Sequence, residues 1–508
     1  MYGSGDVAIQ ILNFCLLPLY VRYLSTSDYG LIALLAGIEA PAKLFFRWGI
    51  DGAFMRFWYE CDDERARQRL ASTVFFFLLA VNGALLALSL AAAPWLSSRL
   101  LDAPASTRAV QIVLLNTFAI GFTFIPFHVL RLENRPREFS ALTIARSIST
   151  LVLRIVFIVG LGYGVMGIVI TDLLVTSVLM VVMLRWFVPL IRPVFSRPLL
   201  GRALAFGLPR VPHGIALQVM AVGDRFVLQR FASVAEVGVY SMGVSFGLIP
   251  KIALGAFEYA WAPFYYATSR EPDAQRVFSV VTTYGVAVLA VMTAGLSAIA
   301  PDLLYVMTGA EYVAASGVVV WTAVGVFFYG VYLLTSIGLN ITSHTNYYPA
   351  STAIGAGVNL GLNFLLIPGY GMLGAAWANG AAYAVQCALA FGFSQRFYPI
   401  AYERGRIARA VGAALLGYLL GTSLPDMPPL AAIIARGTAV LVVTGGVLWL
   451  TRFFSPDELR WLNTLRQRRA AASAVSTPPE TTEMAGEIVS IDIRDDAVEP
   501  SGRKTPPS

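Results

Sequence analysis

The sequence predicts an all-α polytopic membrane protein with about fourteen transmembrane helices, arranged as two parallel six-helix repeats and a C-terminal helix pair. Three observations support this fold class. Of the 508 residues, 57% are hydrophobic and only 13% are charged, whereas soluble domains carry about a quarter charged residues. Apolar stretches of roughly twenty residues, the length that crosses a bilayer, recur along the chain. Finally, parts of the first half of the sequence return in the second half.

The repeated sequences lie 207 or 208 residues apart. VRYLSTSDYG at 21–30 is similar to QRFASVAEVG at 229–238, and AFMRFWY at 53–59 is similar to AWAPFYY at 260–266. GYGVMG at 162–167 returns as GYGMLG at 369–374. Such self-similarity at one offset indicates a duplicated structural unit. We therefore expect one six-helix lobe over residues 1–200 and a second over residues 205–400.

The apolar stretches account for each lobe in order. The first lobe has them near residues 7–24, 30–48, 70–94, 109–130, 141–162 and 164–187. The second lobe has them near residues 208–229, 237–262, 277–301, 316–341, 347–367 and 371–394. Because six spans return the chain to its starting side, the two lobes are expected to be parallel repeats. Stretches near 408–424 and 429–452 predict an appended transmembrane hairpin over residues 405–453.

The composition changes after the hairpin. In SPDELRWLNTLRQRR, Ser455 is suited to cap a helix and Pro456 to occupy its first position, so residues 454–470 are expected to form an interfacial helix. Residues 471–508 are rich in Ala, Ser, Thr, Pro and Glu and poor in aromatic residues. Such a segment cannot bury enough apolar surface to fold, so we expect a disordered cytoplasmic tail.

Basic residues in the loops predict the orientation. With the N-terminus in the cytoplasm, roughly eighteen Lys and Arg fall in inside loops and about three in outside loops. Both termini are therefore expected to be cytoplasmic. The outside loops are short and leave no room for a catalytic domain, so the chain is not expected to be an enzyme. The three cysteines lie far apart, and no spacing predicts a disulfide, a metal site or another cofactor.

Charged residues inside the spans are the candidate functional residues, because they are costly in a membrane. Four of them recur at intervals of four in the second span, which would place them on one helix face: Glu39, Lys43, Arg47 and Asp51. They form either a self-neutralising ladder or a stripe that faces substrate. The repeat places Lys43 over Lys251, and Glu258 follows seven residues later. Each lobe therefore presents a lysine, which we expect to face the interface between the lobes.

Other charged residues are weaker candidates. Arg146 and Arg154 lie deep in the fifth span, and Asp172 in the sixth is either a counter-ion of Arg154 or a site for a coupling cation. In the seventh span, His213 and Asp224 share a face, with Arg210 at its cytoplasmic edge. The candidate substrate-binding residues are Lys43, Arg47, Arg146, Arg154, Arg210 and Lys251. The candidate ion-coupling residues are Glu39, Asp172, Asp224 and Glu258.

Several segments together resemble a known family. They are VRYLSTSDYGLIAL at 21–34, GLPRVPHGIALQVMAVGDRFVLQRFASVAEVGVYSMGVSFGLIP at 207–250, AWAPFYY at 260–266 and GAGVNLGLNFLLIPGYGMLGAAWAN at 355–379. Up to about residue 450, the chain resembles the polysaccharide-export branch of the multidrug/oligosaccharidyl-lipid/polysaccharide (MOP) flippase superfamily, the Wzx-type O-antigen and capsule flippases. The resemblance implies two six-helix lobes in a V-shaped, MATE-like bundle around a central cavity.

The same resemblance implies a function. A relative of these flippases would move an undecaprenyl-diphosphate-linked oligosaccharide, such as an O-antigen, capsule or exopolysaccharide repeat unit, from the cytoplasmic to the periplasmic leaflet of the bacterial inner membrane by alternating access. A lipid diphosphate requires cations in a water-filled cleft and an apolar flank open to lipid. Lys43, Arg47 and Lys251 would supply the cations. H⁺ or Na⁺ is the candidate coupling ion, other glycan assembly and export proteins are candidate partners, and no nucleic acid is expected.

Two alternative functions belong to other classes. A cation-coupled multidrug exporter of the same superfamily would share the fold but would be expected to line its cavity with acidic residues. A membrane glycan polymerase or ligase would need an outside loop with paired polar residues near the bilayer, and the short outside loops offer none.

The topology can be tested with single cysteines in a cysteine-free background. Cysteines replacing Ser27, Ala235 and Asp426 should react with a membrane-impermeant thiol reagent in intact cells, because the basic-residue bias places these positions outside. Cysteines replacing Ser140 and Ser196 should react only after the cells are permeabilised. The reverse pattern would contradict the predicted orientation.

Overall fold

The computed structural model describes residues 17–101 and 103–454, so the predicted tail helix over 454–470 and the tail over 471–508 lie outside it except for Phe454. The described helices belong to one compact unit that ends at Phe453. The regular structure of these residues is helical throughout, as the all-α fold class predicts. The first predicted span is described only from Leu17 onward.

The helices follow the predicted spans. Those of the first half are α2 (Leu17–Val21), α3 (Thr26–Arg47), α4 (Ile50–Trp58), α5 (Glu64–Arg99), α6 (Thr107–Leu132), α7 (Pro136–Ile155) and α8 (Gly164–Phe187). A short helix, α9 (Arg197–Gly207), leads to the second half. The later helices are α10 (Val211–Phe231), α11 (Val234–Gly247), α12 (Ile249–Thr268), α13 (Ala274–Thr308), α14 (Ser316–Thr335), α15 (Ile337–Ile341), α16 (Tyr347–Phe397), α17 (Arg404–Thr422) and α18 (Pro429–Leu450).

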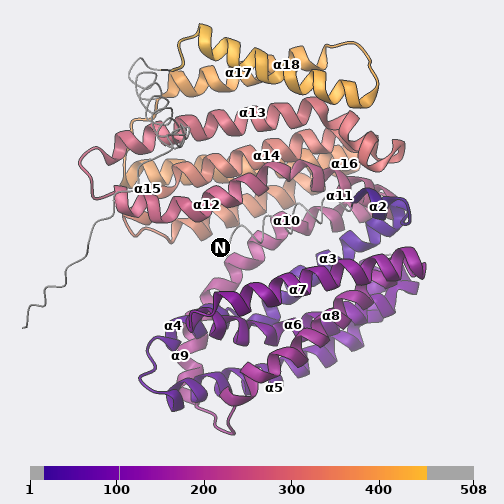
Figure 1. Cartoon of the computed structure of the whole chain (residues 1–508), viewed down its shortest axis with the longest axis vertical. Helices are drawn as coiled ribbons and strands as arrows, with labels where there is room; N and C mark the ends of the chain where they lie inside the picture. The colour runs from indigo at the N-terminus through magenta and orange to yellow at the C-terminus, as the bar shows by residue number, and fades with distance from the viewer. Residues whose placement is uncertain (1–16, 102, 455–508) are drawn as a thin grey trace, which may run out of the picture. The chain divides into compact units, whose positions relative to one another are not determined.

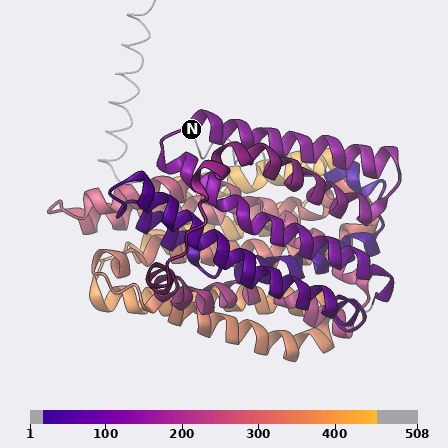
Figure 2. The same ribbon diagram turned by 90° about the horizontal axis from the view of Figure 1, so that it is seen from below.

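Short turns of other helix types complete the chain. They are η1 (Pro104–Ser106), η2 (Val156–Gly160), η3 (Val188–Leu190), η4 (Leu208–Arg210) and η5 (Ala310–Ala315). Figure 1 shows α3 and α5–α8 grouped together, with α10 running from the end of α9 toward α11. Figure 2, seen from below, shows the long helices lying roughly alongside one another.

The helices are suited to a lipid environment. Within the described part of the chain, nine helices are long and apolar enough to cross a membrane, or ten if the bent pair α11–α12 is counted as one span. The predicted number of about fourteen stays a prediction. Large apolar side chains such as Val181 and Leu441 are more than 60% exposed, which in water would produce an aggregation-prone surface. The protein is a multi-pass membrane protein.

The first sequence repeat encodes the start of two equivalent helices. Ser25 precedes α3, where its Oγ accepts a hydrogen bond from the Asp28 N–H at 3.1 Å and its own N–H donates to the Asp28 carboxylate at 2.9 Å. Ser233 precedes α11, where its Oγ accepts from the Glu236 N–H at 3.2 Å. Both serines satisfy N–H groups that the first turn of a helix leaves without partners.

The same repeat also brings these two helices into backbone contact. A Cβ atom on Gly30 of α3 would lie 1.8 Å from the Val234 carbonyl oxygen, and one on Gly238 of α11 would lie 1.9 Å from the Thr26 oxygen. Because the obstructing atoms belong to the backbone, neither can turn aside. The repeat-equivalent glycines therefore allow α3 and α11 to cross at their first turns, above a buried cluster that includes Leu34.

The third repeat encodes a sharp turn between two helices. Gly164, the first residue of α8, and Gly371, inside α16, both have φ of 53°, in the region that favours glycine. At Gly371 the 51-residue helix α16 breaks into two helical segments, as the predicted separate spans 347–367 and 371–394 require. Three residues later, a Cβ on Gly374 would lie 2.6 Å from the Leu366 oxygen, so this glycine lets the second segment pack against the first.

The equivalent spans of the two halves bend at different places. In the first half, Trp48 and Gly49 adopt left-handed φ values of 53° and 66° and separate α3 from α4. In the second half, α11 and α12 meet at Leu248 with a bend of 43°. Pro250 follows in the first turn of α12, where a missing N–H costs little. Pro41 lies inside α3, which continues to Arg47.

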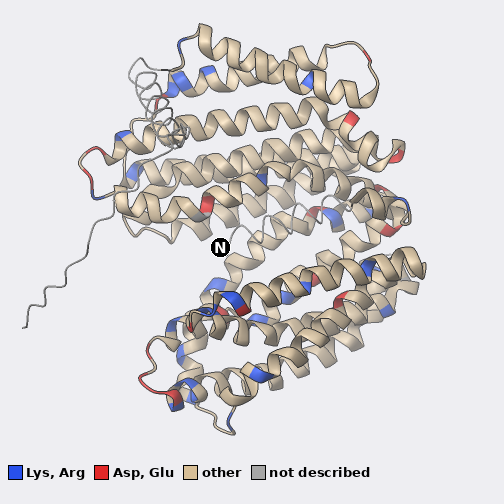
Figure 3. Ribbon diagram, in the orientation of Figure 1, with Lys and Arg blue, Asp and Glu red and all other residues tan. Residues whose placement is uncertain are grey.

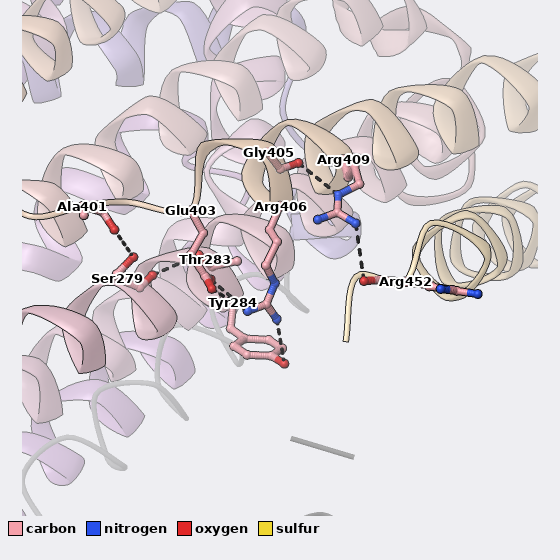
Figure 4. Close-up of polar contacts among 9 residues, drawn as sticks. All are labelled: Ser279, Thr283, Tyr284, Ala401, Glu403, Gly405, Arg406, Arg409 and Arg452. Carbon is pink, nitrogen blue, oxygen red and sulfur yellow. Dashed lines mark hydrogen bonds and ion pairs between the residues drawn. The ribbon is translucent and has the colours of Figure 1, made fainter. Parts of the chain in front are cut away.

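The C-terminal hairpin of α17 and α18 is attached to α13 at one end by a polar cluster. Arg406 of α17 pairs with Glu403 at 2.8 Å and donates a hydrogen bond to the Tyr284 hydroxyl of α13 at 3.3 Å. Ser279 of α13 donates to the Ala401 oxygen at 2.8 Å. Figure 4 shows these groups side by side, together with Arg409 and its carbonyl partners.

A second ion pair attaches the other end of the hairpin. Arg436 of α18 contacts Asp302 of α13 at 2.6 Å, and the two side chains are 13% and 15% exposed. Between the two attachments, Ala414 and Val440 pack with Ala294 and Ala298 of α13. The hairpin is therefore held to the second half of the chain along its length.

The glycine crossing can be tested by adding one methyl group. Gly238→Ala should lower the thermal stability of the purified protein, because overpacking against fixed atoms costs about 1–3 kcal/mol. Gly255→Ala is the matched control, since no atom lies within 4 Å of its added Cβ. Melting temperatures measured by tryptophan fluorescence in detergent would show the difference. Equal stability of the two variants would contradict a tight crossing.

Candidate functional site

The predicted charged stripe of the second span is present on α3, and its pairs are solvent-accessible. The Lys43 ammonium lies 2.7 Å from a Glu39 carboxylate oxygen, and the two side chains are 40% and 24% exposed. Arg47 and Asp51 approach to 3.9 Å. Since α3 ends at Arg47, Asp51 belongs to α4, and the stripe crosses the break at Trp48 and Gly49 instead of following one continuous helix.

The equivalent lysine of the second half has different surroundings. Lys251 lies in the first turn of α12 and is exposed. Its ammonium is 5.2 Å from the centre of the Tyr329 ring, which is within the range of a cation–π contact. Among the described residues, no carboxylate lies within ion-pair distance of Lys251. Glu258, also exposed, follows two helical turns later on α12.

The deep charges of the fifth and sixth spans come together. Arg154 donates to both carboxylate oxygens of Asp172 at 2.9 Å, which joins α7 to α8. The pair is only partly buried, with side chains 27% and 31% exposed. Arg146, two turns earlier on α7, lies in the electrostatic field of Asp172 and Glu39. The first half therefore brings together basic and acidic side chains from α3, α7 and α8.

Asp224 is the most enclosed of the candidate acids. Its side chain is 1% exposed and accepts a hydrogen bond from the Tyr240 hydroxyl of α11. The Arg225 N–H donates to the same carboxylate at 2.8 Å, and the Arg225 guanidinium lies 3.7 Å away. This network joins α10 to α11 next to their connection. A coupling cation would have to enter a site that protein donors already fill.

Arg210 lies at the start of α10, against aromatic and backbone groups. Its guanidinium is 3.9 Å from the centre of the Phe206 ring. Arg210 also lies beside Gly52 of α4, because a Cβ added to Gly52 would be 2.9 Å from Arg210 Nη1. Within the described ranges it has no carboxylate partner at ion-pair distance, so its charge is available at this end of α4.

Basic residues gather at the end of the helices where Arg210 lies. Figure 3 shows many Lys and Arg near α4, α9 and the start of α17, and the predicted cytoplasmic location of this end stays a prediction. In the loop between α4 and α5, burial raises the pKa of the Cys61 thiol. Because the thiolate is the reactive form, Cys61 should label slowly with thiol reagents.

Sequence reasoning missed an aromatic group in the second half. Tyr329 and Tyr332 of α14 stack at 5.9 Å, and Tyr348 of α16 meets Tyr332 edge-on at 6.0 Å. Together with Glu258 they line a cavity of about 440 Å³. The three-residue spacing of Tyr329 and Tyr332 was the available signal, because residues three apart are neighbours on a helix.

Comparisons with known proteins support the fold and the family. Residues 19–317 match the model of a family described as polysaccharide biosynthesis protein. No curated protein matches the sequence significantly. The lipid II flippase MurJ, in an inward closed conformation, superimposes with a TM-score of 0.71 at 17% identity, over 87% of this chain and 98% of that chain.

Drug transporters have the same architecture. An inward-facing multidrug resistance MATE family transporter of the MOP superfamily superimposes with a TM-score of 0.59 at 16% identity, over 79% of this chain and 95% of the other. A MATE transporter in complex with MaD3S gives a TM-score of 0.55 at 16% identity, over 80% and 94%. This chain therefore belongs to the polysaccharide biosynthesis protein family and has the fold of the MOP superfamily, which confirms the resemblance found in its sequence.

Proposed function

We propose that this protein is a flippase that moves an undecaprenyl-diphosphate-linked oligosaccharide across the bacterial inner membrane, from the cytoplasmic to the periplasmic leaflet. The observation that carries the proposal is the pair of exposed lysines, Lys43 and Lys251, at equivalent positions of the duplicated unit. The family match to polysaccharide biosynthesis proteins supplies the glycan side of the proposal.

The exposure of these lysines favours a role in binding. An exposed ion pair such as that of Lys43 with Glu39 contributes only about 0–1 kcal/mol. A charge-assisted hydrogen bond to a diphosphate contributes about 1.5–3 kcal/mol. A diphosphate therefore displaces Glu39 at little cost. Among the described residues, no acid lies at ion-pair distance from Lys251, so a diphosphate that binds there displaces none.

The cation-coupled drug exporter is the principal alternative. MATE transporters share the fold, so the fold does not distinguish the two functions. Charge distinguishes them in the first half, because a site for cationic drugs needs unpaired acids, whereas Glu39 is paired with Lys43 and Asp172 with Arg154. Coupling of export to H⁺ or Na⁺ through one of the candidate acids belongs to either function.

Replacing the lysines tests the diphosphate site. Lys43→Ala or Lys251→Ala should weaken the binding of farnesyl diphosphate to the purified protein about ten- to a hundredfold, since each 1.4 kcal/mol is a factor of ten. Lys251→Arg should keep part of the affinity, because the positive charge remains. Isothermal titration in detergent gives the affinities, and complementation of surface-glycan export in a flippase-null strain gives the activity.

Two further variants make this test decisive. Arg99 is the last residue of α5, away from the proposed site. Arg99→Ala also removes one positive charge and should change neither measurement. The double variant Lys43→Met with Glu39→Gln separates binding from neutralisation. If it restored the export that Lys43→Met loses, Lys43 would serve only to neutralise Glu39, and its binding role would be refuted.

The Arg154–Asp172 pair gives a separate prediction about ion coupling. Asp172→Asn should lower thermal stability and export, because it leaves the Arg154 charge without its partner. The loss should be smaller than the roughly 3–5 kcal/mol of a fully buried pair, since both side chains are partly exposed. The double variant Asp172→Asn with Arg154→Gln should recover both. A stable double variant that exports nothing would instead show that Arg154 or Asp172 takes part in transport itself.

A further inference from the structure

The aromatic cavity of the second half is separate from the ion pairs of the first. It encloses about 440 Å³, within the range of about 300–1,000 Å³ for small-molecule sites. Its walls come from α10, α12, α14, α15 and α16. These helices belong to one half of the chain, so the cavity does not depend on how the two halves meet.

Aromatic rings make up one wall of the cavity. Tyr332 stacks on Tyr329 with ring planes 28° apart and meets Tyr348 edge-on at 82°. Trp261 and Tyr265 of α12 add two further rings. The face of an aromatic ring is apolar and carries a partial negative charge. It therefore suits a flat ligand surface of C–H groups, which are weakly positive.

Polar groups lie at the edges of these rings. The Asn340 amide donates to the Tyr348 hydroxyl at 2.9 Å, which in turn donates to the Ser336 oxygen at 2.8 Å. His213, from α10, has a buried Nδ1 atom for which the described part of the chain provides no hydrogen-bond partner. An unpaired buried polar atom is costly. The part-exposed remainder of the His213 ring lines the cavity, where it can hydrogen-bond to a ligand hydroxyl group.

One acid lines the cavity, and a lysine outside the lining lies near it on the same helix. Glu258 lines it, and Lys251 lies two turns earlier on the same helix, with Tyr329 beneath its ammonium. The acid and the lysine interact electrostatically. The nearby lysine charge weakens the attraction of Glu258 for an organic cation. A neutral ligand with apolar faces and polar edges fits this combination, and a pyranose ring has both.

The cavity also lies near the first-half stripe. A Cβ on Gly214 of α10 would be 2.8 Å from the Leu44 side chain of α3. Leu44 follows Lys43 in the chain, and Gly214 follows His213, which lines the cavity. Helix α10 therefore lines the cavity and also contacts α3. Because Lys251 lies two turns from Glu258 on α12, a substrate whose diphosphate contacts Lys251 can place its sugar in the cavity.

We propose that this cavity binds the first neutral sugar of the lipid-linked substrate, by stacking on Tyr332 and by hydrogen bonding to His213. The inference rests on the proposed flippase function and assigns its sugar subsite to the second half of the chain. The sugar ring lies against the tyrosine faces while its hydroxyl groups reach the His213 and Asn340 side chains. The diphosphate stays with the lysines, so the two parts of the headgroup bind to different residues.

The test compares two probes that differ only in the sugar. Farnesyl diphosphate and its conjugate with one neutral hexose are titrated into the purified protein in detergent. The native protein should bind the conjugate about tenfold more tightly, as expected for one stacked ring contact with its hydrogen bonds. Tyr332→Leu and His213→Leu should each remove most of this gain and leave the affinity for farnesyl diphosphate unchanged.

Matched variants separate the sugar contact from folding. Tyr332→Phe keeps the ring and should keep most of the gain. Tyr305→Leu removes an exposed tyrosine of α13 outside the cavity and should leave both affinities as they are. Lys251→Ala should weaken both probes alike, because it acts on the diphosphate. Melting temperatures identify any variant that loses affinity through unfolding.

The outcomes distinguish this inference from the function on which it rests. Equal affinities of the native protein for both probes, or equal losses in Tyr332→Leu, would overturn the sugar subsite and leave the flippase proposal in place. Failure of the native protein to bind either probe would overturn both. If tetraphenylphosphonium bound and Tyr332→Leu abolished its binding, the cavity would be a cation site, and the sugar subsite would be refuted.

Discussion

The close crossing of α3 and α11 is the contact on which the arrangement of the two halves depends. Gly30 and Gly238 come from equivalent positions of a duplicated sequence, and a Cβ atom on either would clash with the backbone of the other helix. The serine caps Ser25 and Ser233 fix where both helices begin, so the glycines meet at the same turn. Buried residues such as Leu34 and Tyr240 then close around the crossing. One duplicated segment therefore supplies both sides of this contact.

From that crossing the two equivalent spans continue along different courses, because they bend at different residues. The break at Trp48 and Gly49 leaves Lys43 inside α3, next to Glu39. The bend at Leu248 leaves Lys251 in the first turn of α12, over an aromatic ring. Duplication thus preserved the position of a lysine in the sequence, while the local backbone gave each lysine a different partner. Such asymmetry suits the proposed substrate, whose headgroup has a charged diphosphate and a neutral sugar.

The charged residues within the helices fall into three groups that differ in exposure and partners. The pairs on α3 are exposed and cost little to separate. The Arg154–Asp172 pair is bidentate and partly buried, so both partners depend on each other. Asp224 is enclosed by Tyr240 and Arg225, which makes its network a joint between α10 and α11. Only the exposed pairs of the first group leave a cation free to exchange its partner for a ligand anion.

The sequence by itself determined the all-helical membrane fold, the duplicated unit and the family, because hydrophobic stretches and capping or glycine motifs act locally and are written in consecutive residues. Gly164 and Gly371 illustrate this, since the second glycine of the shared GYG motif has the same φ in both halves. The sequence also identified Lys43, Lys251, Arg154 and Asp172 as costly charges. Only the tertiary structure decided their partners, and only it brought His213, Glu258, Tyr332 and Tyr348 from four helices around one cavity. Helix packing joins residues more than a hundred positions apart, and no local pattern in the chain records which faces meet.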